Sequence, residues 1–236
     1  MDLYKKEIRL LSTDVDVYRR LRLSALFTRM QEAAIEHTTA LGAGREKTLD
    51  KGFLWIVTQQ QVQIRRMPEY DERLTHLDWP GKTMHVFFPR FSRFVDEAGE
   101  TVIEASALWC LMDKNNRSLI FPEEHDIRIH GCPPEQNLSL PVRIRPVETD
   151  RHSSFVVPFS YLDLNGHMSN IHYFDMVMDL LPEEYRRKSI REIITEYRGE
   201  ACLGDCLELH SRLEKESLWL FGQTDRPVFR MKLGFS

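Results

Sequence analysis

The residues best suited to chemistry in this chain form one short segment, Asp163-Leu-Asn165-Gly-His167. Asp163, Asn165 and His167 alternate along an extended backbone, so their side chains point to one side. A helix predicted just after them would present free backbone N–H groups nearby. An amide, an imidazole and a helix N-terminus can polarise a carbonyl group, and a carboxylate can orient the first two. The segment therefore predicts acyl transfer or hydrolysis.

The same residue types also occur in ordinary turns and helix caps, in which case His167 would be a loop histidine without a chemical role. A degenerate copy in the first half weakens that alternative. Asp14, Asp16 and Tyr18 precede a predicted helix with the same spacing, but Asp and Tyr replace the Asn and His. If the chain has one active site, the second half contains it.

The elements that must position this segment follow the same order in both halves. In the first half, an amphipathic pattern predicts a helix over 24–41, with Ser24 as its cap and Gly42 at its end. Alternating patterns then predict strands over 54–64, 83–95 and 101–112, the last two joined by a turn at 96–99. In the second half, a helix over 169–181 precedes strands over 190–198, 206–213, 219–223 and 228–235.

This repeated order of a helix and antiparallel strands predicts an α+β fold with an internal repeat. Asp71 and Asp205 are expected to end matching loops in the two halves. A proline-rich stretch separates the halves and reads as a linker on the surface. We therefore predict an N-terminal unit over 1–121, a linker over 122–153 and a C-terminal unit over 154–236.

The composition excludes several classes of function. Of 236 residues, 42% are hydrophobic and 29% charged, and the formal net charge is -4, which disfavours a nucleic-acid or anionic-membrane partner. No apolar run has the length of a signal peptide core or a membrane span, so a cytoplasmic location is expected. Cys110, Cys132, Cys202 and Cys206 are expected to be reduced. Because no His/Cys set around Cys202 and Cys206 has zinc spacing, no metal site is expected.

The segment from Asp163 to Tyr173, DLNGHMSNIHY, closely resembles the D-x-N-x-H-x-N-N-x-x-Y signature of acyl-acyl-carrier-protein (acyl-ACP) thioesterases, with Ser169 in place of the first Asn of the pair. The segment EYRGE, from Glu196 to Glu200, is similar to the E-Y-R-x-E strand end of that family. The resemblance also includes LSALF at 23–27 and MQEAA at 30–34. It covers nearly the whole chain and is of the bacterial type, because the chain has no transit peptide.

This resemblance implies a tandem double hot-dog fold, in which two helix-plus-antiparallel-sheet units form one continuous sheet. The first unit would house the acyl chain and the second would supply the catalytic groups. The implied reaction is hydrolysis of fatty acyl-ACP to free fatty acid and ACP in fatty acid biosynthesis. The substrate carries its own phosphopantetheine, so no cofactor is implied, and the partner is the acidic acyl carrier protein.

By position, the resemblance assigns catalytic roles to Asp163, Asn165, His167 and Glu200. Glu200 would draw a proton from water or act as the nucleophile, and we favour activated water. Asn165 and His167 would stabilise the oxyanion, with Asp163 orienting one of them. Plant members have a cysteine directly after this glutamate, but Ala201 stands here and Cys202 follows. A cysteine mechanism is therefore disfavoured.

The substrate and partner contacts are less constrained by the sequence. The helix over 24–41 and an aromatic set are candidates for the acyl tunnel: Trp55, Phe87, Phe88, Trp109 and Phe121. An acidic carrier predicts a basic docking patch. The candidates are Arg19, Arg20, Arg22, Arg143, Arg145, Arg186, Arg187 and Lys188.

Three alternative functions stay open on this fold: a thioesterase for acyl-CoA or another small acyl thioester, a dehydratase, and an acyl-binding protein without catalysis. A dehydratase needs only a histidine and an acid, and the pattern around Asp163 does not favour it. A monomer and a homodimer both fit the sequence.

Overall fold

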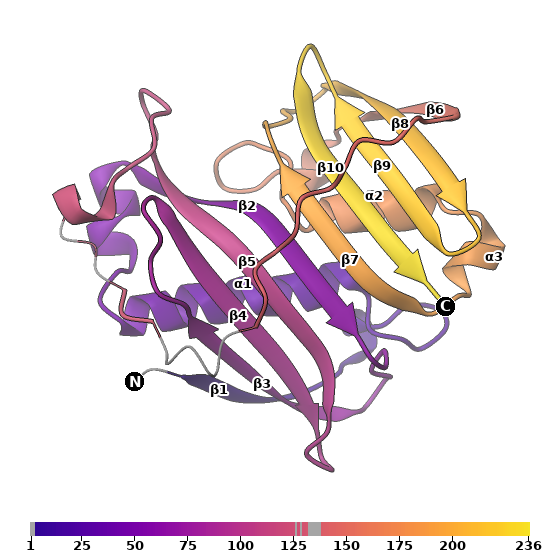
Figure 1. Ribbon diagram of the computed structural model, residues 1–236, viewed down its shortest axis with the longest axis horizontal. Helices are drawn as coiled ribbons and strands as arrows, with labels where there is room; N and C mark the ends of the chain where they lie inside the picture. Colours follow the sequence, from indigo (N-terminus) through magenta and orange to yellow (C-terminus); the bar gives the residue numbers. More distant parts are fainter. Residues whose placement is uncertain (1–2, 126, 128, 132–137) are drawn as a thin grey trace.

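The computed structural model describes residues 3–125, 127, 129–131 and 138–236, and its described strands form one antiparallel sheet (Figure 1). The sheet order is β1-β3-β4-β5-β2-β7-β10-β9-β8-β6. Each half of the chain contributes five consecutive positions, and the two sets run in mirrored order from the junction between β2 and β7. The sheet is therefore built from two copies of one unit.

The first half contains the long helix α1 (Leu23–Ala40) and five strands. The strands are β1 (Tyr4–Arg9), β2 (Phe53–Ile64), β3 (Arg73–Pro80), β4 (Phe87–Asp96) and β5 (Thr101–Asp113). The second half contains α2 (His172–Leu180), the one-turn helix α3 (Glu183–Arg186) and five strands. These are β6 (Arg151–Val156), β7 (Ile190–Tyr197), β8 (Cys206–Glu214), β9 (Ser217–Gln223) and β10 (Pro227–Phe235).

Both long helices cover the same face of the sheet, which lies in front of them in Figure 1. They meet where the Phe27 and Phe174 rings stack with centroids 3.7 Å apart. One hydrophobic core runs through this contact, from Leu26 and Ile103 in the first half to Ile193 and Leu233 in the second. The halves therefore share a core, and the predicted α+β arrangement of two helix-plus-sheet units in one sheet is confirmed.

Helix α1 is amphipathic as predicted, with Leu26, Met30 and Ala33 on its buried face. It begins at Leu23, and Arg22 occupies the N-cap position, so the prediction of Ser24 as the cap was wrong. Gly42 follows its end with φ +79°, a left-handed conformation that glycine adopts without a steric penalty.

Three strands were not predicted: β1, β3 and β6. Strand β6 begins at Arg151, inside the range assigned to the linker. Five of its six residues are exposed, so it carries no alternating apolar pattern that a sequence could reveal. The boundaries of the two units at 121 and 154 stay a prediction.

The described part of the linker crosses the sheet face opposite the helices (Figure 1). The Val142 amide donates to Gln61 Oε1 at 3.1 Å, and the Ile144 amide donates to Glu196 Oε1 at 2.6 Å. Gln61 lies on β2 and Glu196 on β7, so the linker ties the two halves at their junction. Pro133-Pro134 lies outside the described residues. Within the described ranges, no helix has the length and apolar character needed to cross a membrane.

Candidate active site

The segment from Asp163 to His167 forms a tight loop built around the Asp163 carboxylate. Asp163 Oδ1 accepts hydrogen bonds from the backbone amides of Asn165 (2.8 Å) and His167 (3.2 Å), and the Asp163 amide donates to the His167 carbonyl at 2.8 Å. Gly166 turns the chain with φ +80°. The Asn165 side-chain nitrogen lies 3.5 Å from Asp163 Oδ2. Asp163 therefore fixes the loop backbone and orients Asn165.

A short backbone pairing brings His167 next to Glu200. The Met168 amide donates to the Ala201 carbonyl at 2.7 Å, and His167 forms a β-bridge with Cys202. As a result, His167 Nε2 and Glu200 Oε2 are 3.5 Å apart. The structure therefore brings together the four residues selected from the sequence, three on the loop and one just beyond β7.

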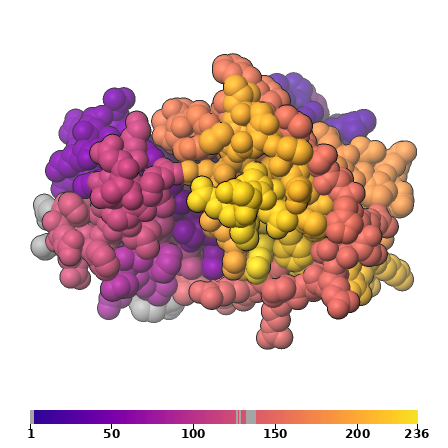
Figure 2. Space-filling model, turned by 90° about the horizontal axis from the view of Figure 1, so that it is seen from above, coloured from indigo at the N-terminus to yellow at the C-terminus, as the bar shows by residue number. Residues whose placement is uncertain are grey.

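Arg117 is a further member of this group that the sequence analysis missed. It lies in the turn after β5, in the first half of the chain, and its guanidinium forms an ion pair with Glu200 Oε2. The side chains of His167, Glu200 and Arg117 are 24%, 31% and 40% exposed, so the group is open to a ligand from solution. No local motif marks Arg117, because its partner is far along the chain and only the pairing of the two halves joins them. Figure 2 shows the halves side by side.

The helix N-terminus contributes less than the sequence suggested. Helix α2 begins at His172, and the amides of Ile171 and His172 donate to the hydroxyl and carbonyl oxygens of Ser169. These two N–H groups are therefore engaged inside the turn. The side chains of Asn165 and His167 stay the candidate oxyanion donors.

The cysteine next to the site has no activating partner among the described residues. Cys202 is exposed, and its backbone amide, rather than its thiol, is held by Asp205 at 2.7 Å. Cys110 is buried in the first half, and burial raises the pKa of its thiol to about 11. Cys132 lies outside the described residues.

An apolar cavity of about 300 Å³ opens beside the loop over 163–167. Leu164, between Asp163 and Asn165, lines it together with the C-terminal part of α1 and strands of the first half. Of the aromatic residues selected from the sequence, Trp55, Phe88 and Trp109 line this cavity, whereas Phe87 and Phe121 do not. Leu164 is 84% exposed, so the loop that carries the candidate catalytic residues borders the mouth of this pocket.

The first half contains a loop with the same backbone hydrogen bonds, but in a different register from the one inferred from the sequence. Asp16 Oδ1 accepts from the amides of Tyr18 (2.8 Å) and Arg20 (2.9 Å), as Asp163 does from Asn165 and His167. The counterparts of Asn165 and His167 are therefore Tyr18 and Arg20. The alignment of Asp14 with Asp163 was wrong by two residues, because two aspartates stand close together there.

The remaining counterparts follow from equivalent backbone bonds. The Leu21 amide donates to the Pro68 carbonyl as the Met168 amide does to Ala201, which places Met67 opposite Glu200. The same comparison pairs Asp205 with Glu72, not Asp71, since Glu72 accepts from the Glu69 amide as Asp205 does from Cys202. The counterpart loop therefore lacks the amide, imidazole and carboxylate.

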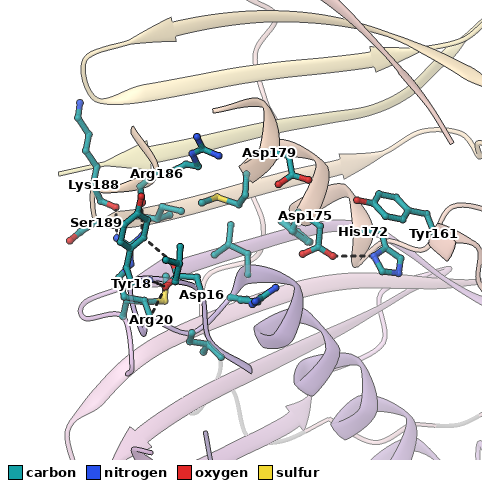
Figure 3. A pocket seen from close by; sticks show the side chains of 18 of the residues that line it. Asp16, Tyr18, Arg20, Tyr161, His172, Asp175, Asp179, Arg186, Lys188 and Ser189 are labelled. Carbon is teal, nitrogen blue, oxygen red and sulfur yellow. Dashed lines mark hydrogen bonds and ion pairs between the residues drawn. The ribbon is translucent and has the colours of Figure 1, made fainter. Parts of the chain in front are cut away.

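The counterpart loop borders a cavity of about 480 Å³ between the loop, α2 and the segment after α3 (Figure 3). Arg20 donates to the carbonyl oxygens of Arg186, Arg187 and Lys188, at 3.2 Å for Arg187 and 3.0 Å for Lys188. The Arg187 guanidinium in turn lies 5.1 Å from the Tyr18 ring centroid. This loop therefore binds the two halves together.

These contacts reduce the set of basic residues available to a carrier protein. Arg20 and Arg22 donate to backbone carbonyls, and Arg187 pairs with Glu183. Arg143 and Arg145 are exposed on the described part of the linker. Arg19 is also at the surface, with its guanidinium 5.8 Å from the Tyr70 ring centroid.

Comparison with known proteins identifies the family. Residues 1–125 match the model of the acyl-ACP thioesterase N-terminal domain, and residues 144–225 match that of the C-terminal domain. Because these matches cover most of the chain, the protein belongs to the acyl-ACP thioesterase family. The resemblance found in the sequence is thereby confirmed.

Individual relatives have low sequence identity to this chain but align with most of its length. A chloroplastic dodecanoyl-[acyl-carrier-protein] hydrolase of Cinnamomum camphora is 23% identical over 87% of this chain and 58% of its own length. A chloroplastic palmitoyl-acyl carrier protein thioesterase of Arabidopsis thaliana is 24% identical over 84% of this chain and 52% of its own. The chain thus spans little more than half the length of these curated relatives.

Solved structures match the fold along its full length. An acyl-ACP thioesterase from Bacteroides thetaiotaomicron superposes with a TM-score of 0.86 at 21% identity, covering 99% of this chain and 98% of that one. A 12:0-ACP thioesterase from Umbellularia californica gives 0.83 at 19% identity, with coverage of 99% and 97%. The fold is therefore the double hot-dog type seen in these thioesterases.

Proposed function

We propose that this protein hydrolyses fatty acyl-ACP to free fatty acid and ACP, as the names of its relatives describe for those proteins. The observation that carries the proposal is the contact of Glu200 with His167, which lies on a loop whose Leu164 borders an apolar pocket. A thioester carbonyl placed near Asn165 and His167 leaves its acyl chain beside Leu164, at the entrance of that pocket.

In the mechanism we favour, Glu200 accepts a proton from water as the water oxygen attacks the thioester carbonyl. Negative charge develops on the carbonyl oxygen, and N–H donors of Asn165 and His167 stabilise it. The tetrahedral intermediate then expels the phosphopantetheine thiolate, which takes a proton from the Glu200 carboxyl. Asp163 holds the loop that positions both donors. Arg117 supplies the counter-charge to Glu200.

The roles can be tested by single substitutions in the full chain. Asn165→Ala, His167→Ala and Glu200→Gln should each lower kcat by two orders of magnitude or more, because each removes a group that acts on the reacting atoms. Cys202→Ala should keep nearly full activity. Full activity in His167→Ala, or loss of activity in a folded Cys202→Ala variant, would rule out this mechanism.

A panel of substrates would establish the reaction class and the preferred substrate. Acyl-ACP and acyl-CoA thioesters of graded chain length would be incubated with the protein, and both the released thiol and the fatty acid identified. We expect kcat/KM to be higher for acyl-ACP than for acyl-CoA with the same acyl group. Equal values would indicate a general acyl thioesterase, and the absence of thiol release would indicate an acyl-binding protein.

The proposal includes docking of ACP on a basic surface at the exposed Arg143 and Arg145. The double substitution Arg143→Glu/Arg145→Glu should raise KM for acyl-ACP and leave KM for acyl-CoA unchanged. An equal rise for both substrates would reject this surface. We also propose that the reaction needs no metal or other cofactor, so turnover should survive a chelator. A cytoplasmic site of action and a monomeric or dimeric state belong to the same proposal.

A further inference from the structure

The apolar pocket beside the catalytic loop ends on a buried ion pair. Arg90, on β4, lines the pocket together with Thr38 of α1. Its Nε donates to Asp78 Oδ1 at 2.5 Å, and its Nη1 donates to Thr38 Oγ1 at 3.1 Å. Ser92 Oγ donates to Asp78 Oδ2 at 2.6 Å. The side chains of Arg90 and Asp78 are only 8% and 1% exposed, so the pair lies inside the first half.

Next to Arg90 lies a small void of about 10 Å³ with a mixed polar and apolar lining, which is close to the space of one water molecule. Arg90, Ala34 and Trp109 line both this void and the apolar pocket. Gln60 also lines it, and its Oε1 is buried without a hydrogen-bond partner among the described residues. The polar region therefore continues inward from Arg90.

Small side chains lie between the polar groups of Arg90 and Gln60. The strands place Arg90 opposite Ala107, and Ala107 opposite Gln60, so a small side chain stands between two polar ones. Ala34 and Ala105 complete the apolar part of the lining with Met30 and Trp109. Buried polar groups of Asp78, Arg90 and Gln60 therefore lie at this end of the pocket beside small and apolar side chains.

We propose that the Arg90–Asp78 pair, with Gln60 behind it, is a polar floor that sets the maximum length of the acyl chain. This inference rests on the proposed function, because it assumes that the pocket holds the acyl group of the substrate. Each methylene buried in the apolar part contributes about 0.8 kcal/mol, or about four-fold in affinity. A chain that reaches Arg90 gains nothing more, because a further methylene would displace polar groups from their partners or from water.

The test replaces the polar side chains of the floor by apolar side chains of similar volume. In the variant Asp78→Leu/Arg90→Met/Ser92→Ala, apolar side chains of similar size replace the ion pair. Ser92 is also replaced, because its hydroxyl would otherwise lose its acceptor, Asp78. Such replacements of buried ion pairs are commonly neutral or stabilising. The matched control is Arg93→Met/Glu104→Leu, since Arg93 and Glu104 form an ion pair at 2.8 Å across β4 and β5. That pair does not line the pocket.

Hydrolysis of a series of unsubstituted acyl-ACP substrates would be measured for the wild type and both variants. In the wild type, kcat/KM should rise with chain length and then fall abruptly. In the triple variant, the chain two carbons beyond the wild-type optimum should gain about 15-fold relative to that optimum, from two further buried methylenes. The control should keep the wild-type profile.

An unchanged profile in a folded triple variant, or an equal shift in the control, would overturn the proposal. Gln60→Leu provides a second test, because it removes an unpartnered group and leaves the ion pair intact; it should shift the profile in the same direction by a smaller factor. No shift in either variant would reject the floor. Failure of the wild type to hydrolyse any acyl thioester would instead reject the proposed function.

Discussion

The two loops that begin the helices of the two halves have the same backbone and different chemistry. In each, an aspartate carboxylate accepts the amides of the residues two and four positions later. The first loop has Tyr18 and Arg20 where the second has Asn165 and His167, and the segments paired with the loops have Met67 and Glu200 at equivalent positions. Since the hydrogen-bonded aspartate is present in the loop without the other three groups, its primary role is to build the loop.

The two loops also differ in role: the first stabilises the contact between the halves, and the second is accessible to a substrate. Arg20 donates to carbonyl oxygens after α3, so the first loop joins the halves. His167 faces Glu200 and Arg117 at a partly exposed position, so the second loop is available to a substrate. Equivalent substitutions in the two loops should therefore have opposite consequences.

The largest contrast is expected between His167→Ala and Arg20→Ala. Loss of the imidazole should lower kcat/KM by about 1000-fold, through lost oxyanion stabilisation, with little change in the free energy of unfolding. Loss of Arg20 should destabilise the protein by about 2 kcal/mol, because it removes charged donors from carbonyl oxygens. Turnover of acyl-ACP and urea denaturation would measure the two effects.

The control for this pair is Arg20→Lys, which keeps the charge but loses the fork geometry that spans several carbonyls. It should have intermediate stability and wild-type turnover. A large loss of turnover in folded Arg20→Ala would show that the first loop takes part in the reaction, and the contrast between the loops would be wrong.

A second test compares the two aspartates, Asp16→Ala and Asp163→Ala. Both substitutions leave two loop amides without their acceptor, so each should lower the free energy of unfolding by about 1 to 2 kcal/mol. Only Asp163→Ala should also lower kcat, by about 10- to 100-fold, through misplacement of the donors. Asp163→Asn keeps an acceptor oxygen and should recover most of that loss. A catalytic role for the charge itself would instead make Asp163→Asn as inactive as Asp163→Ala.

A third difference between the halves is a buried titratable group. His76 on β3 is 2% exposed, and its ring stacks on Phe94; the equivalent position on β8 is Leu209. Burial lowers the pKa of His76 to about 4. Its ordinary pKa is near 6.5, so the unfolded chain binds a proton first as the pH falls. Stability should therefore decrease as the pH falls from about 6.5 toward 4.

At pH 5 this loss amounts to about 2 kcal/mol relative to pH 8. His76→Leu, which copies the second half, should remove this part of the pH dependence of the free energy of unfolding, measured by denaturant titration. His152→Leu, at an exposed position, is the control and should keep the wild-type slope. An unchanged slope in His76→Leu would mean that other groups cause the acid sensitivity.

The sequence was sufficient for the features that depend on local pattern. The stripe of α1 and the alternating strands β2 and β5 follow from hydrophobic periodicity, and the loop from Asp163 to His167 from a motif. It was insufficient for edge strands such as β6, whose exposed residues have no periodicity. It also missed Arg117 and Arg90, because their roles depend on partners brought close only by the pairing of distant strands.

The smallest expected effect concerns the turn of each loop. Gly166 has φ +80° and Arg19, its counterpart, has φ +65°, so both backbones are left-handed. An added Cβ at Gly166 meets no atom within 4 Å, and Gly166→Ala should cost only the backbone strain, about 1 kcal/mol. Arg19 already has this strain, so Arg19→Gly should be neutral or slightly stabilising.

Denaturant titration of Gly166→Ala and Arg19→Gly would compare the two turns directly. The Gly166→Ala variant should keep most of its turnover, because the bonds to Asp163 still hold the loop. If Arg19→Gly were instead clearly destabilising, the Arg19 side chain at the Tyr70 ring would outweigh the strain of its backbone. The two loops would then differ in how they stabilise the turn as well as in the chemistry of their side chains.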